Sequence, residues 1–181
     1  FYDPKEGNIF INNTNVNKIS QNSLRKIIGV VPQDTVLFND TIYYNIAYGN
    51  TGATKEEVIS AAQNADIHDF ITILPDGYET IVGERGLKLS GGEKQRVAIA
   101  RTILKNPKIF FFDEATSALD TSTEKEIQKN LENVSKGKTT LIIAHRLSTA
   151  ANADNIIVLD QGAIIEQGTH ESLLLEKGKY F

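Results

Sequence analysis

Two kinds of hydrophobic pattern alternate along the chain. Short apolar runs bounded by Gly, Pro, Asn or Asp occur near the start and throughout the second half, and such runs are typical of strands. Elsewhere apolar residues recur at intervals of three and four, which predicts helices with one buried face. Gly7–Asn13 is predicted as a short strand entering an Asn-rich turn, and further strands are predicted at Ile27–Val31, Lys108–Phe112 and Thr139–Ala144. Asn155–Leu159 and Ala163–Glu166 are predicted to form a hairpin around Asp160-Gln161-Gly162. The predicted helices lie at Glu56–Ala65, with Thr54 as its N-cap, at His68–Leu74, at Ser90–Lys105, ended by Asn106-Pro107, and at Thr121–Val134; a last helix is capped by Gly168-Thr169 and runs through Leu175.

The order of these elements predicts an α/β fold with a mostly parallel sheet flanked by helices. Ile109–Phe112 is an unbroken apolar run, as expected for a strand buried on both faces of a parallel sheet, and Thr139–Ala144 is predicted as a second buried strand. The strand pattern disappears for about seventy residues after Pro32. We therefore expect a helical subdomain at residues 34–106, inserted into an α/β core made of residues 1–33 and 107–181.

Composition restricts the class of protein without identifying a function. Apolar residues make up 40% and charged residues 23% of the 181 positions, an ordinary balance for one globular domain. The net charge of −4 disfavours a broad nucleic-acid-binding face, which needs clustered Lys and Arg. The absence of Cys excludes disulfides and thiolate metal sites. The sequence has no Met and begins with Phe1, so we expect it to be a piece of a longer protein.

The segment LSGGEKQR, residues 89–96, places two glycines where a predicted helix begins. Ser90 and Glu93 fit a capping box, in which each side chain accepts from the backbone N–H of the other residue. Gly91 and Gly92 also let a ligand approach the backbone, and a helix N-terminus favours a phosphate. From these residues alone a plain helix cap is favoured over an anion site, and both interpretations stay open.

Two adjacent carboxylates, Asp113 and Glu114, follow the apolar run Ile109–Phe112. In open α/β sheets ligands bind beyond the carboxyl ends of the strands, so both side chains are expected at a binding crevice. Asp113 is placed to hold Mg²⁺, and Glu114 to orient or deprotonate an attacking water. The alternative is that both acids only begin a turn, and this stretch alone does not decide between the two.

Two further polar residues stand at the ends of predicted strands. His145 follows Thr139–Ala144, where its imidazole could donate to a phosphate oxygen or to the attacking water. Gln33 follows Ile27–Val31 and Pro32, and it carries a neutral donor and acceptor. Taken singly, His145 is better explained as a cap on a strand end, and Gln33 carries no functional signal.

Together these motifs closely resemble the nucleotide-binding domain of ABC transporters. The resemblance rests on several motifs in a fixed order and covers essentially the whole chain, which makes it specific. Phe1–Pro4 looks like the stretch that follows the first helix of exporter-type domains. The matching motifs are the Q-loop at Gln33, the exporter X-loop at Thr80–Gly86, the signature LSGGEKQR, the Walker B motif at Ile109–Glu114, the D-loop at Ser117–Asp120 and the switch histidine His145.

The resemblance implies an ATPase that uses ATP and Mg²⁺. It implies that Asp113 and Gln33 serve Mg²⁺, and that Gln33 also senses the nucleotide and couples to a transmembrane domain. Glu114 is implied to activate the water, and His145 to contact the γ-phosphate. The signature is implied to act in trans, on an ATP held mainly by a second copy of the domain. The residues implied to contact nucleotide or metal are Gln33, Ser90, Gly91, Gly92, Glu93, Asp113 and Asp120.

One family motif does not occur in the sequence. This is Gly-x-x-x-x-Gly-Lys-Ser/Thr, which wraps the phosphates, and the resemblance places it just before Phe1 together with the aromatic that stacks on adenine. We therefore expect the chain to be part of a full-length ATPase. The 181-residue piece alone is expected to show no measurable ATPase and weak or absent ATP binding. It is also expected to fold poorly, because Ile109–Phe112 and Leu141–Ala144 would lack neighbours.

Within the family, the chain is most similar to exporters. Residues 31–46 and 83–92 look most like mitochondrial half-transporters of the ATM type, which are linked to export of glutathione-related or sulfur compounds; half-transporters for heavy-metal conjugates are similar. This implies a homodimer with its own transmembrane domain, located in a membrane, which for the ATM type is the mitochondrial inner membrane. The alternative is a non-transport ABC-type ATPase or an ATP-binding regulatory module, serving partners, DNA repair or translation. The acidic balance argues against a nucleic-acid partner.

Overall fold

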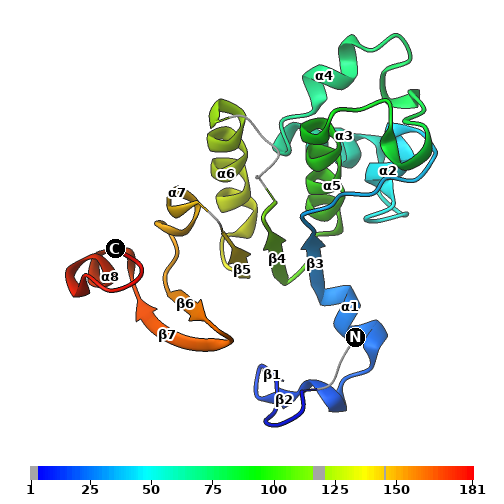
Figure 1. Cartoon of the computed structure of the whole chain (residues 1–181). Coiled ribbons are helices and arrows are strands. Elements are labelled where there is room, and N and C mark those ends of the chain that lie inside the picture. Colours follow the sequence, from blue (N-terminus) through cyan, green and yellow to red (C-terminus); the bar gives the residue numbers. More distant parts are fainter. Residues whose placement is uncertain (1–3, 116–120, 145) are drawn as a thin grey trace. The chain divides into compact units, whose positions relative to one another are not determined.

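The computed structural model describes residues 4–115, 121–144 and 146–181. The chain forms two compact units, Phe1–Leu141 and Ile142–Phe181. Figure 1 follows the elements of both units from the N-terminal strands to the last helix. Within the described ranges, the helices are too short or too polar to cross a membrane.

The first unit begins with a small hairpin. β1 (Phe10–Ile11) and β2 (Thr14–Asn15) pair antiparallel across Asn12 and Asn13, which both have positive φ. Asn tolerates this left-handed conformation better than most residues, which accounts for the Asn-rich turn predicted there. The 3₁₀ turn η1 (Val16–Lys18) and helix α1 (Gln21–Ile27) then lead to the sheet. Helix α1 was not predicted from the sequence.

A three-stranded sheet of order β3-β4-β5 follows (Figure 1). β3 (Ile28–Val31) and β4 (Ile109–Asp113) run parallel, with Val31 opposite Phe112. β5 (Thr139–Ile143) lies on the other side of β4. All three strands begin and end within one residue of their predicted limits. The predicted α/β class with a parallel sheet is confirmed, because β3 and β4 pair in parallel and the chain between them forms helices.

Four α-helices lie between β3 and β4. The two longest each begin with a capping box, from Thr54 in one and Ser90 in the other. The second of them ends at Asn106, which is left-handed and precedes Pro107, as the predicted helix break requires. The elements of this segment are α2 (Ile42–Ala47), α3 (Lys55–Asn64), α4 (His68–Ile73), η2 (Gly77–Glu79), η3 (Glu84–Gly86) and α5 (Gly91–Lys105).

Helix α5 supplies much of the core of the first unit. It packs against α2, α3 and β3, and its apolar side chains share one buried cluster with those of β4 and α6 (Thr121–Ser135). Burying one Val, Ile or Leu side chain stabilises the fold by about 1.5–3 kcal/mol. The cluster includes Val97, Ile99 and Ile103 of α5, Phe110 and Phe112 of β4, and Ile127 and Leu131 of α6.

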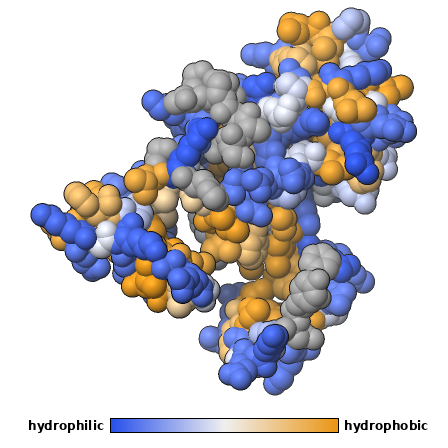
Figure 2. All heavy atoms as spheres, viewed as in Figure 1, coloured by the Kyte–Doolittle hydropathy of each residue, from blue (hydrophilic) through white to orange (hydrophobic). Residues whose placement is uncertain are grey.

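The two strands predicted as buried differ in the structure, because β4 alternates buried and half-buried residues whereas most of β5 is exposed. Phe110 and Phe112 are buried in the helical cluster, whereas Val30 and Leu141 are 54% and 49% exposed. Successive strand residues point to opposite faces, so the consecutive exposed residues Leu141, Ile142 and Ile143 expose β5 on both faces. The prediction that Thr139–Ala144 is a buried strand is wrong. The expectation that apolar residues lack neighbours is confirmed for Leu141, and it is wrong for Phe110 and Phe112. Figure 2 shows this apolar surface over the strands.

The second unit is built around the predicted hairpin. Its strands pair antiparallel across Gln161 and Gly162, which both have positive φ, as a tight two-residue turn requires. Ile156, Leu173 and Tyr180 form its small core. The elements are α7 (Leu147–Ala150), β6 (Ile156–Asp160), β7 (Ala163–Gly168) and α8 (His170–Glu176), whose N-cap is Thr169.

Candidate functional site

The ends of β3 and β4 bring Gln33 and Glu114 together. The strands are parallel with Val31 opposite Phe112, so the second residue beyond each pair emerges at the same carboxyl edge. Gln33 Nε2 donates to Glu114 Oε2 at 2.9 Å, although the residues lie 81 positions apart in sequence. Glu114 has a φ of 47°, a left-handed conformation that is uncommon outside Gly and that clusters at functional sites.

Asp113, the last residue of β4, stands beside this pair. It is half-buried, and strand alternation directs it to the face opposite Phe112. Mg²⁺ prefers oxygen ligands and usually takes one or two protein carboxylates. The carboxylate of Asp113 and the amide oxygen of Gln33 are donors of this kind, and the Gln33 amide uses a different atom, Nε2, to bond Glu114. By their chemistry, these two donors suit a magnesium ion.

The N-terminus of α5 contains the capping box that the sequence indicates. Ser90 Oγ accepts from the Glu93 amide at 3.3 Å, and Glu93 Oε2 accepts from the Ser90 amide at 2.7 Å. The amides of Gly91 and Gly92 have no acceptor within the helix, because the first turn of any α-helix lacks one. Ser90 and Gly91 are exposed. The cap therefore coexists with an open, partly positive helix end that suits a phosphate.

Gln95, one turn further along α5, is a connection that the motif analysis missed. Its Nε2 donates to the Pro32 carbonyl at 3.1 Å, and its Oε1 accepts from the Thr35 hydroxyl at 2.9 Å. The side chain is 2% exposed. A signal was present in the sequence, since Gln95 lies four residues before the buried Ile99 and so on the apolar stripe of the helix.

A second buried connection joins α5 to α2. Arg101 donates from Nε to the Asn45 carbonyl at 2.7 Å and from Nη2 to Asn45 Oδ1 at 2.9 Å. Burial lowers the pKa of the Arg101 guanidinium. Arg101 also lies 5.4 Å from the ring centroid of Phe38, whose other neighbours are Tyr44 and Tyr48, with ring centroids at 5.9 and 4.5 Å. These three exposed rings, Phe38, Tyr44 and Tyr48, are called the aromatic patch below.

The X-loop segment Thr80–Gly86 packs between α5 and the chain before α2. The Thr80 carbonyl accepts from the Ile42 amide at 3.0 Å, and the Asp40 carbonyl accepts from the Val82 amide at 3.1 Å. Gly86 has a φ of +74°, and a Cβ there would lie 2.9 Å from Lys94 Cδ. This close approach explains why glycine stands at the end of the X-loop.

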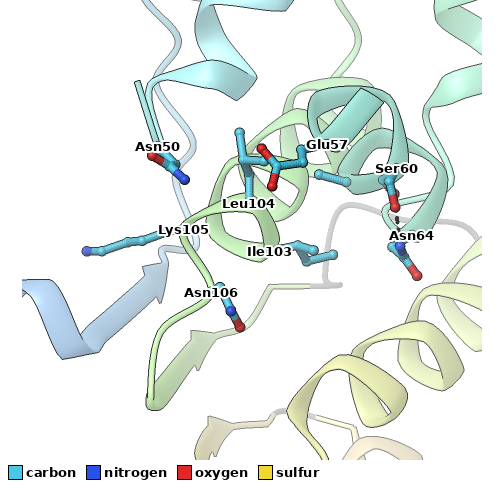
Figure 3. Close-up of a pocket in the computed structure, with 9 residues that line it drawn as sticks. Asn50, Glu57, Ser60, Asn64, Ile103, Leu104, Lys105 and Asn106 are labelled. Carbon is cyan, nitrogen blue, oxygen red and sulfur yellow. Dashed lines mark hydrogen bonds between the residues drawn. The ribbon is translucent and has the colours of Figure 1, made fainter. Parts of the chain in front are cut away.

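Two predicted site residues cannot be placed. Asp120 and His145 lie outside the described residues. The pocket in Figure 3, with a volume of about 410 Å³, lies elsewhere, between α3 and the C-terminal end of α5. None of the predicted site residues lines it. Its Lys105 is already engaged, donating to the carbonyls of Arg25 and Ile28 at 2.8 and 2.7 Å.

Comparison with curated proteins gives long, closely similar matches. An ATM1-type heavy metal exporter of Novosphingobium aromaticivorans is 61% identical over 180 residues, which make up 99% of this chain and 30% of the relative. The mitochondrial iron–sulfur clusters transporter ABCB7 of Oryzias latipes is 56% identical over 181 residues, 100% of this chain and 24% of the relative. This chain therefore spans less than a third of the length of either protein.

The fold also matches a solved structure. A bacterial Atm1-family ABC exporter with ATP bound gives a TM-score of 0.97 at 60% sequence identity, over 99% of this chain and 32% of that chain. The sequence model of the ABC transporter family matches residues 1–117. These findings confirm the resemblance carried by the motifs, and the chain belongs to the ABC transporter family.

Proposed function

We propose that this chain is part of the ATP-hydrolysing motor of an ABC exporter. The observation that carries the proposal is the hydrogen bond between Gln33 and Glu114, 2.9 Å long, at the carboxyl edge of a parallel sheet. It unites the Q-loop with the acid that ends the Walker B motif, and this edge is where open α/β sheets bind ligands. We further propose residues 34–106 as the helical subdomain and residues 1–33 with 107–181 as the α/β core.

The chain's own residues have distinct parts in this hydrolysis. Asp113 and the amide oxygen of Gln33 would hold Mg²⁺, which would neutralise charge on the phosphate oxygens. Glu114 orients the attacking water and accepts its proton. The bond from Gln33 Nε2 fixes one oxygen of the Glu114 carboxylate, so the orientation of the base depends on the position of the Q-loop. His145 would donate to the terminal phosphate, and Asp120 would contact the nucleotide.

The second catalytic surface comes from another copy of the chain. Ser90 and the amides of Gly91 and Gly92 form an exposed helix end that attracts a phosphate held by the partner. Glu93 completes the cap that holds this helix end in shape. A homodimer therefore brings each signature onto the ATP bound mainly by its partner. The net charge of −4 argues against a nucleic-acid partner.

The aromatic patch is the surface proposed to meet the transmembrane domain of the same transporter. Its rings are 41% to 51% exposed. Arg101, which donates to Asn45, lies against the Phe38 ring. A rigid apolar surface of this kind suits contact with another protein domain. We propose a metal-conjugate, glutathione-related or sulfur-containing cargo, and the names of two relatives, a heavy metal exporter and an iron–sulfur clusters transporter, support the metal and sulfur parts of this proposal. They also support a membrane location, and the name of one relative supports mitochondria.

Substitution of the proposed base tests the function. In the full-length protein, Glu114→Gln should preserve ATP binding and lower ATP turnover by roughly 10²–10⁴-fold, because an amide cannot accept the proton. Glu56→Gln, on the exposed surface of α3, is the matched control and should leave turnover unchanged. Unchanged turnover in Glu114→Gln would remove this residue from the proposed role.

The 181-residue chain by itself is proposed to be inactive. It contains no Gly-x-x-x-x-Gly-Lys-Ser/Thr segment to wrap the phosphates. The exposed Val30 and Leu141 also leave one face of the sheet uncovered. Magnesium-dependent ATP turnover by the purified 181-residue chain would contradict this part of the proposal.

A further inference from the structure

Gln95 connects helix α5 to both sides of Gln33. Its amide bonds to the Pro32 carbonyl, 63 residues away in sequence, and to the Thr35 hydroxyl, 60 residues away. Both bonds are therefore tertiary. Because Pro32 and Thr35 flank Gln33, one buried side chain holds the whole four-residue segment that carries the Q-loop glutamine.

A buried side-chain amide at a core position destabilises the fold unless its polar atoms are hydrogen-bonded. Leu or Met would fill a similar volume on the apolar stripe with no polar group to satisfy. Thr102, on the same helix, shows the ordinary solution, because its hydroxyl donates to the Ala98 carbonyl of its own helix at 3.0 Å and approaches the Val30 carbonyl at 3.4 Å. Gln95 instead directs both ends of its amide at residues 32–35, which indicates that the position of this segment is what the residue specifies.

Gln95 also stands close to the signature end of the helix. Five residues separate it from Ser90, about 7.5 Å along the axis at 1.5 Å per residue. The intervening turns are regular α-helix, and Gln33 bonds Glu114 at the other end of the connection. A continuous path of covalent and hydrogen bonds thus runs from Ser90, through Gln95 and Gln33, to Glu114.

We propose that Gln95 is a positioning residue for Glu114. By fixing residues 32–35 to α5, it makes the Gln33–Glu114 bond depend on the position of the signature helix. Phosphate binding at the N-terminus of α5 and orientation of the water-activating carboxylate then change together. This inference rests on the proposed function, since it gives Gln95 a part in the same hydrolysis.

A double-mutant cycle in the full-length protein tests this role. Gln95→Leu should lower kcat for ATP hydrolysis about tenfold and change KM for ATP by less than about twofold, because the loss affects the reacting geometry and not ATP binding. Gln33→Ala should lower kcat at least as much. The double variant should be no slower than Gln33→Ala alone, because Gln95 acts through Gln33. Effects that multiply would overturn the inference.

Thr102→Val is the matched control. It removes a buried side-chain hydrogen bond from the same helix at nearly constant volume, and Thr102 is 6% exposed against 2% for Gln95. Thr102→Val should lower Tm and leave kcat within about twofold of the wild-type value, which is the behaviour of a purely structural residue. If Gln95→Leu lowers Tm but leaves kcat unchanged, Gln95 is also a purely structural residue and the proposal is overturned.

Hydrogen exchange distinguishes failure of this inference from failure of the proposed function. In Gln95→Leu the peptide spanning residues 33–38 should exchange faster than in the wild type, whereas Thr102→Val should leave it unchanged. Faster exchange in a full-length protein that does not hydrolyse ATP would support the anchoring and overturn only the proposed hydrolysis. Unchanged exchange in Gln95→Leu would overturn the inference whatever the ATPase shows.

Discussion

The first turn of α5 and its middle satisfy their polar groups in opposite ways. Ser90 and Glu93 bond to each other and to nothing distant in the described structure. Gln95 and Arg101 bond to residues of the Q-loop and of α2, more than fifty positions away. The first turn is exposed and locally complete, whereas the middle is buried and depends on the rest of the unit.

Because of this difference, the first turn of α5 is suited to contacting a ligand, and the middle of α5 is suited to transmitting a change in position to other residues. A helix end that completes its own cap keeps its shape without neighbours, so it can face a phosphate on another molecule. A helix interior anchored by long-range bonds cannot move without moving its partners. In α5 both properties occur on one rigid element, with the phosphate contact at the tip and the connections to the Q-loop and the aromatic patch behind it.

The largest effect in this comparison is expected from the connection between α2 and α5. Asn45→Ala removes a fully buried side chain that accepts from Phe38 N and Arg101 Nη2, both at 2.9 Å, and donates to two carbonyls. Leaving those groups unpaired should destabilise the protein by about 3 kcal/mol or more. The fall in Tm of the full-length protein measures this loss.

Asn64→Ala provides the control for that prediction. Asn64 donates only to the Ser60 carbonyl of its own helix, at 2.8 Å, and should cost within about 0.5 kcal/mol. Equal losses of Tm in the two variants would show that the long-range bonds of α5 are no more important than a local one.

A smaller effect on stability, with a clear effect on function, is expected at the caps. Ser90→Ala and Thr54→Ala each break one capping box and should each lose about 1 kcal/mol of stability. Only Ser90→Ala should also lower ATP turnover, by roughly 10- to 100-fold, because a hydrogen bond to a charged phosphate contributes about 1.5–3 kcal/mol. ATPase assays on both variants decide between a plain cap and an anion site. A similar fall in turnover for Thr54→Ala would favour the plain cap.

The smallest effect concerns the C-terminal end of α5. Burial lowers the pKa of Lys105 below its ordinary value of 10.5. Between the lowered pKa and 10.5 the unfolded chain holds more protons than the folded one, so this group makes stability rise with pH in that window. Below the window Lys105 is charged in both states and its contribution is constant. Measurements of Tm from mildly alkaline pH to 10.5 should show a slightly more positive slope for the wild type than for Lys105→Met. Parallel slopes would contradict the shift.

The sequence predicts the elements of α5 and its neighbours well, and it predicts their connections poorly. Helices α3 and α5 were predicted from apolar periodicity and from the Thr54 and Ser90 caps, which depend on residues three or four positions apart. Helices α1, α2 and α7 were not predicted. The motif order also placed Gln33 and Glu114 at strand ends, but a sequence pattern contains no information on the distance between them.

What the sequence determined by itself was therefore everything that near neighbours decide: the caps, the strand limits, the Asn and Gly turns and the motif order of an ABC transporter domain. The tertiary structure alone decided that Gln33 reaches Glu114 across 81 positions, that Gln95 reaches back 63 positions to Pro32, and that β4 is largely buried while β5 is exposed. The physical reason is that a cap or turn needs only the geometry of a few adjacent residues, whereas a bond across dozens of positions exists only after the core has packed and fixed both partners.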